Sequence, residues 1–274
     1  MGLFDRLKGY YTHMLFIEGD EFERALPTML GNVPDATSSN AHNKEMEMFL
    51  YKLFAKNTGR IAGEGLRLFT EFIEKGYPLA QELNVATQDS AFGKIVTAQQ
   101  VLDNPFATEE QKTNNGLIMR LGFSDFIRDV KKVNSKATSN DSLLGELEEM
   151  NSIGIPELDP KYLSPEEGQH FNKEIAPFFG RLQYRVDDKS SGLPTPLAKK
   201  SLEFLEAFAK AGYPSAQEMM GLIAYNSDDK KALNHWAKQV EKNPFSTEEQ
   251  KKNARDDVKD TQAFVAQTQA RGGR

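Results

Sequence analysis

Two short phrases occur twice in this chain, in the same order. GYPLAQE begins at Gly76 and GYPSAQE at Gly212, with six of seven positions identical. NPFATEEQKTN begins at Asn104 and NPFSTEEQKKN at Asn243, with nine of eleven identical. Identity in a fixed order over such a distance indicates an internal duplication, so the two copies must share one fold.

A weaker third match lies upstream. NKEMEMFLYKLF from Asn43 resembles NKEIAPFFGRLQ from Asn172, and each follows a histidine, His42 or His170. The copies of the first phrase are 136 positions apart and those of the second are 139 apart. The second copy therefore has three additional residues between its phrases. We expect a loop to contain them, because an insertion inside a packed helix would rotate its apolar face away.

The first phrase has the features of a joint between helices. Apolar residues recur at helical spacing before each copy: Leu66, Phe69, Phe72 and Ile73, then Leu202, Leu205, Phe208 and Ala209. The glycine that follows suits the left-handed residue after a helix, and the proline suits the first turn of the next helix. Ala80 and Ala216 are small enough to let two helices approach closely.

The second phrase has the features of a second joint. Pro105 and Pro244 end the preceding helix, because the residue before proline is pushed out of helical geometry. Thr108 and Thr247 then stand three residues before a glutamine, with two glutamates between. This spacing predicts a capping box at the start of the next helix. Both phrases are therefore interpreted as scaffold.

The second copy also resembles a known repeat. The stretch from Ala209 to Trp236 is similar to the Sel-one-like repeat, a relative of the tetratricopeptide repeat. The matching residues are Ala209, Gly212, Ala216, Gln217, Gly221, Tyr225, Lys231, Ala232 and Trp236. The glycine-rich loop of that family is shortened here to NSDD, and the first copy keeps only Gly76, Ala80 and Gln81. The resemblance implies antiparallel helix pairs and a role in protein recognition.

The expected fold class is all-α: an α/α helical repeat, solenoid-like, with two duplicated multi-helix lobes. No run shows the sustained alternation of a strand. We expect an amino-terminal lobe at residues 1–135, a connecting segment at 136–165 and a carboxy-terminal lobe at 166–274. The connecting segment carries Pro and Gly signals of loops around a short helix, LLGELEEM.

The composition of the chain limits the classes of function that we expect for it. With 40 acidic and 34 basic side chains the net charge is −6, which argues against nucleic-acid binding and favours a basic protein partner. No apolar run is long enough to cross a bilayer, and the first residues lack the features of a secretory signal. There is no cysteine, so disulfides and thiolate chemistry are excluded, as fits a reducing cytoplasm.

No catalytic, cofactor or metal motif is present. His13, His42, His170 and His235 form no zinc-binding pattern, and the acidic runs are those of solvated helix faces. One alternative is a hydrolase in which His42 and His170 face each other between the lobes with a carboxylate. Another is a peripheral membrane protein anchored by an amphipathic first helix, which carries Leu3, Phe4, Leu7, Tyr10, Tyr11, Met14 and Leu15. We prefer the interpretation that this helix packs in the core of the amino-terminal lobe.

The leading hypothesis is a non-enzymatic cytoplasmic adaptor that binds another protein. A bacterial immunity protein that neutralises a toxin is the specific example. The candidate partner-binding residues are Tyr77, Gln81, Tyr213, Gln217, Tyr225, His235 and Trp236. Large amphipathic side chains of this kind are common in binding hot spots. The alternative is that these aromatic side chains pack in the core, as Tyr225 and Trp236 would if they follow the family.

Overall fold

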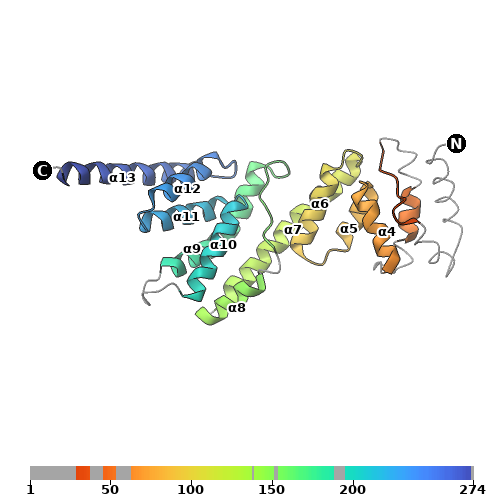
Figure 1. The fold of residues 1–274 in the computed structure, drawn as a ribbon, viewed down its shortest axis with the longest axis horizontal. Helices are drawn as coiled ribbons and strands as arrows, with labels where there is room; N and C mark the ends of the chain where they lie inside the picture. The colour runs from red at the N-terminus through yellow and green to blue at the C-terminus, as the bar shows by residue number, and fades with distance from the viewer. Residues whose placement is uncertain are drawn as a thin grey trace. The chain divides into compact units, whose positions relative to one another are not determined.

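The computed structural model describes residues 29–37, 46–53, 63–137, 139–150, 154–187 and 195–272. Within these ranges every regular element is a helix, which confirms the all-α helical-repeat fold (Figure 1). The chain divides into two compact units, Met1–Gly122 and Phe123–Arg274.

The first unit runs from an extended segment at 32–37 through a helix at 46–53 to four further helices. These are α4 (Gly63–Glu74), α5 (Pro78–Ala86), α6 (Ala91–Asp103) and the first part of α7 (Glu109–Lys136). The second unit contains the rest of α7, then α8 (Asn140–Met150), α9 (Pro165–Asp187), α10 (Pro196–Lys210), α11 (Pro214–Asn226), α12 (Lys230–Lys242) and α13 (Glu248–Gly272). The series α10 to α13 thus repeats the series α4 to α7.

The three additional residues of the second copy do not enlarge a loop, contrary to the prediction. Helix α5 has 9 residues and α11 has 13, whereas α6 and α12 both have 13. The connection after α11 is one residue shorter than the connection after α5. An extension at the free end of a helix leaves the register of the preceding turns unchanged, so the packing of the shared part is preserved.

The division between the units falls inside α7, upstream of the predicted connecting segment. Phe123 stacks on Phe171 with ring centroids 4.9 Å apart, and Arg181 Nη1 donates to the carbonyl of Asn134 at 2.6 Å. These contacts join residues 123–137 to the second unit. The helical period alone cannot reveal this division, because one continuous helix supplies residues to two cores.

Each unit has an aromatic core with the same central pair. Phe72 meets Tyr77 edge to face at 5.0 Å in the first unit, and Phe208 meets Tyr213 in the same way at 5.2 Å in the second. Such tilted pairs add to the stabilisation from apolar burial. Leu66 is an exception to the predicted apolar stripe, since 48% of it is exposed.

The predicted glycine joints are confirmed. Gly76 follows α4 with φ of +80°, and Gly212 follows α10 with φ of +87°. Pro78 and Pro214 then open the next helix in each unit. A residue with positive φ is strained unless it is glycine, which explains why both copies keep one here.

Candidate functional site

The two repeated phrases meet in space at a buried asparagine. In the first unit, Asn104 Nδ2 donates to the carbonyl of Gly76 and to Oε1 of Gln81, both at 2.8 Å. Its own Oδ1 accepts the backbone N–H of Phe106 at 2.8 Å. Gln81 donates in turn to the carbonyl of Ile73 at 3.4 Å. We call this set of hydrogen bonds the asparagine lock.

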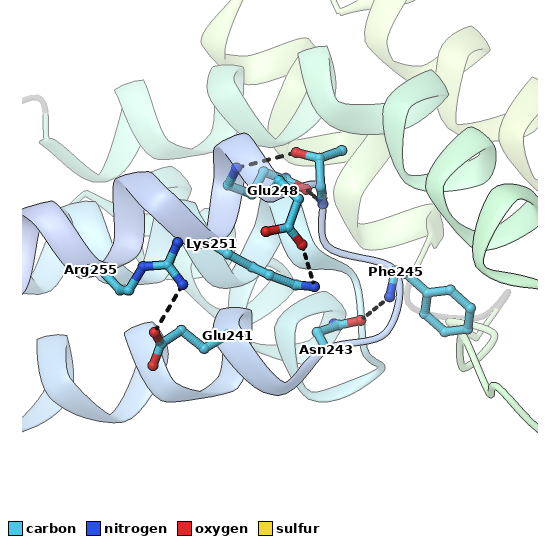
Figure 2. Close-up of polar contacts among 8 residues, drawn as sticks. Glu241, Asn243, Phe245, Glu248, Lys251 and Arg255 are labelled. Atoms are coloured by element: carbon cyan, nitrogen blue, oxygen red, sulfur yellow. Dashed lines mark hydrogen bonds and ion pairs between the residues drawn. The ribbon is translucent and has the colours of Figure 1, made fainter.

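The second unit repeats the asparagine lock. Asn243 Nδ2 donates to the carbonyl of Gly212 at 2.8 Å and to Oε1 of Gln217 at 3.0 Å. Figure 2 shows the side-chain oxygen of Asn243 pointing at the backbone N–H of Phe245, which donates to it at 2.9 Å. Gln217 donates to the carbonyl of Ala209 at 3.0 Å. The lock gives a donor to the carbonyls of Gly76 and Gly212 and a second donor to the carbonyls of Ile73 and Ala209 at the helix ends.

The end of the second phrase adds a capping box and a further bond. The backbone N–H of Thr247 donates to Gln250 Oε1 at 3.0 Å, and the N–H of Gln250 donates back to Thr247 Oγ1 at 3.2 Å. Gln250 Nε2 also reaches Glu218 Oε2 at 2.6 Å. The first unit has the same arrangement at Thr108, Gln111 and Glu82. The predicted capping boxes are therefore confirmed.

Ion pairs support the start of α13. Arg255 lies 3.6 Å from Glu241 and so links α13 to α12, while Lys251 pairs with Glu248 at 3.0 Å within α13 (Figure 2). These side chains are partly exposed, so each pair stabilises the joint by about 0.5 kcal/mol. The hydrogen bonds of the lock, which are buried, contribute more.

Tyr77 and Tyr213 do not lie on a binding surface. Their exposed fractions are 0% and 1%, because each ring inserts into the aromatic core beside the joint. Burial raises the pKa of both phenols far above the usual range. These residues correct the expectation that joint tyrosines present their rings to a partner. Their role is packing.

Of the other predicted partner-binding residues, some belong to the scaffold and some lie at the surface. Gln81 and Gln217 belong to the asparagine lock, and Gln217 is only 4% exposed. His235 is exposed, and its ring meets Trp236 edge to face at 4.8 Å. Trp236 keeps 9% of its surface exposed. Tyr225 is 47% exposed and lies at the far end of α11, away from these residues.

Gln217, His235 and Trp236 line one hollow in the second unit, which we call the Trp236 groove. Its volume is about 750 Å³, and its walls come from α10, α11, α12 and the extended segment before α9. Leu158 forms part of the wall, and its N–H donates to the carbonyl of Ala211 at 2.8 Å. Three of the predicted partner-binding residues are thus brought together.

Four side chains of the Trp236 groove differ from their counterparts in the first copy, whereas the hydrogen bonds of the asparagine lock are the same in both units. The groove contains Lys210, His235, Trp236 and Lys242. The corresponding residues of the first copy are Glu74, Val96, Thr97 and Asp103. Since the first unit folds with these other residues, the scaffold does not demand the basic and aromatic set. That set is therefore available for a function specific to the second unit.

One repeated feature was not predicted from the sequence. The segment VPDA from Val33 and the segment IPEL from Ile155 both pass over a glycine joint. Ala36 N–H donates to the carbonyl of Lys75 at 2.9 Å, which is the equivalent of the bond made by Leu158. The shared signal is a proline followed by an acidic residue, and it is too short to stand out without the structure.

The described residues form no arrangement that supports the hydrolase alternative. His170 is exposed on α9, and His42 lies outside the residues that the structure describes, as does the amphipathic first helix. Within the described ranges, no three His, Asp or Glu side chains gather in a way that could hold a metal ion. Over the same ranges, no helix combines the length and apolar character that crossing a membrane requires.

Comparison with protein-family models, curated proteins and solved structures found no match. The resemblance to Sel-one-like repeats therefore stays a prediction. Any assignment of function rests on the geometry of the two units and on the differences between them.

Proposed function

We propose that this chain is a non-catalytic protein-recognition module whose partner binds in the Trp236 groove. The observation that carries the proposal is the contrast between the copies. The asparagine lock is retained bond for bond, while Lys210, His235, Trp236 and Lys242 in the groove beside it differ from their counterparts in the first copy. A duplicated scaffold with one specialised surface is typical of helical-repeat binding proteins.

The chemistry of the groove supports recognition of a protein segment. Trp236 provides a mostly desolvated aromatic wall, and His235 and Gln239 offer exposed polar groups beside it. Lys242 adds positive charge, while Lys210 is paired with Glu206 at 2.7 Å. A partly buried aromatic residue surrounded by polar groups is the usual composition of a binding hot spot. An adaptor or a toxin-neutralising immunity protein would use such a groove.

The test is affinity capture from the native lysate with three proteins. The first is the wild type, and the second carries Lys210→Glu, His235→Val and Lys242→Asp, which are the residues of the first copy. The third is a matched control, Lys199→Glu with Lys238→Asp, at exposed positions on α10 and α12 outside the groove. The proposal expects one stoichiometric partner with wild type and control and its loss with the groove variant. Equal capture by all three proteins would contradict it.

A further inference from the structure

A second hollow of the second unit lies between α11 and α13. It consists of two adjoining parts of about 380 and 260 Å³ that share Leu233 of α12 as a lining residue. Leu222 and Tyr225 line it from α11, and Asp257 and Asp260 line it from α13. We call this the α11–α13 groove. Its walls use none of the exposed residues of the Trp236 groove.

The apolar side of the α11–α13 groove is unusually accessible. Leu222 is 37% exposed and Tyr225 is 47% exposed, although both are large apolar or aromatic side chains on a well-packed helix. They are three residues apart, so they lie on the same face of α11. Leu233, which is buried, closes the groove from below. Together they offer a site for an apolar side chain of a partner.

The rim of the groove is acidic. Asp257 and Asp260 stand on one face of α13, and Asp228 and Asp229 stand at the connection between α11 and α12. Asp229 caps α12 by accepting the N–H of Ala232 at 3.0 Å. The basic residue that lines the groove is Lys230, and it approaches Asp228 at 4.0 Å.

Burial and neighbouring negative charges disfavour the ionised form of two carboxyls at this groove. Partial burial raises the pKa of Asp257 above its ordinary value, and the neighbouring Asp260 and Asp256 raise it further. At the closed end of the groove, burial also raises the pKa of Glu218, although its hydrogen bond from Gln250 opposes the shift. A cationic side chain placed here would relieve this repulsion.

Three residues of the groove are specific to the second copy. Asp257 and Asp260 replace Ile118 and Leu121 of α7, and Tyr225 lies on the extension by which α11 exceeds α5. The fold forms in the first unit without these carboxylates and without this extension. Asp257, Asp260 and Tyr225 are therefore features that the repeat scaffold does not need.

We propose that the α11–α13 groove binds a basic amphipathic segment of a partner protein. Lysine or arginine side chains of the segment contact Asp257 and Asp260, and an apolar side chain packs between Leu222 and Tyr225. Charge complementarity selects this occupant, because the rim is acidic and the whole chain carries a net charge of −6. The exposed tyrosine ring adds a surface on which a cation can stack.

The test uses a synthetic amphipathic peptide rich in lysine and leucine, and fluorescence anisotropy measures its binding to the protein. A peptide of the same pattern with glutamate in place of lysine serves as the ligand control. The protein variants are Asp257→Asn with Asp260→Asn in the groove, and Asp256→Asn on the same helix but outside the lining. Circular dichroism verifies that each variant is folded, as expected for isosteric changes that remove repulsion.

We expect saturable binding of the lysine peptide that weakens as salt is added, and weaker binding by about tenfold in the double variant. The Asp256→Asn protein should bind as the wild type does, and the Trp236 groove variant, whose added negative charge also attracts a cation, should show no loss of affinity. Absence of binding, equal binding of the glutamate peptide, or an equal loss with Asp256→Asn would overturn the proposal. Because the Trp236 groove variant is included, these outcomes are distinct from a failure of the proposed function.

Discussion

The side-chain amide of Asn243 lies 3.0 Å from the side-chain oxygen of Gln217, and both residues are buried. Asn104 and Gln81 make the equivalent bond at 2.8 Å in the first unit. One residue of each pair belongs to the first repeated phrase and the other to the second. The phrases have been retained together because each supplies half of one hydrogen-bond network.

Replacing Asn243 by alanine should destabilise the second unit by about 3 kcal/mol, because it leaves the buried oxygen of Gln217 and the carbonyl of Gly212 without their donor. Asn104→Ala should act likewise on the first unit. Hydrogen exchange followed by mass spectrometry resolves the two units, since each variant should lose protection mainly in its own unit. Asn253→Ala, at an exposed position on α13, is the control. A change of similar size with Asn253→Ala would contradict the role of the lock.

Gly212→Ala should cost more stability than Gly76→Ala. Both glycines have positive φ, which alone costs about 1 kcal/mol for alanine. A Cβ on Gly212 would also stand 3.0 Å from the carbonyl oxygen of Leu158, whereas a Cβ on Gly76 meets only Ala36 at 3.9 Å. We therefore expect losses of about 2 kcal/mol and about 1 kcal/mol in urea unfolding. If Gly76→Ala cost more stability than Gly212→Ala, the prediction would be wrong, and the segment that contains Leu158 would have to shift easily to make room for the added Cβ.

Two glycines of α9 should respond in opposite directions to alanine. A Cβ on Gly168 would overlap the ring of Phe245, which is buried and unable to move aside, so Gly168→Ala should cost about 2 kcal/mol. Gly180 has open space at its Cβ, so Gly180→Ala should stabilise the helix by about 0.5–1 kcal/mol. Thermal unfolding measures both effects. Stabilisation by both substitutions would contradict the packing of Phe245 against α9.

Glu218 should make the second unit less stable at neutral pH than in mild acid. Burial raises the pKa of its carboxyl, and Asp257 and Glu249 add to the shift. The folded state therefore holds this proton more tightly than the unfolded state. Stability contributed by this group is lost as pH rises from the ordinary carboxyl pKa through the raised one. Glu218→Gln, which can still accept the bond from Gln250, should raise the unfolding midpoint at neutral pH and flatten its pH dependence. A lowered midpoint would contradict this.

The sequence predicted the helices and their joints because local chemistry specifies them. Glycine with positive φ, proline in the first turn and the Thr247–Gln250 capping box need no distant partner to be recognised. The sequence did not predict that Asn104 and Asn243 lock the joints, because their partners lie more than twenty positions away. The burial of Tyr77 and Tyr213 likewise depends on tertiary packing.

The candidate surfaces were predicted only in part. His235 and Trp236 were found as polar and aromatic residues of the second copy, and the structure adds Leu158 and Lys242 to the same groove. The α11–α13 groove was not predicted, because its acidic wall resembles an ordinary solvated helix face. Comparison of α13 with α7 in the register of the second phrase, 139 positions apart, shows the difference.

The measurement that tests the central claim most directly is calorimetric titration of the captured partner into purified protein. The Lys210→Glu, His235→Val and Lys242→Asp variant is compared with wild type and with the Lys199→Glu, Lys238→Asp control. Recognition by the Trp236 groove predicts equal affinity for wild type and control and a loss of about a hundredfold in the groove variant, with unfolding midpoints unchanged. Equal affinity of all three proteins would contradict the account.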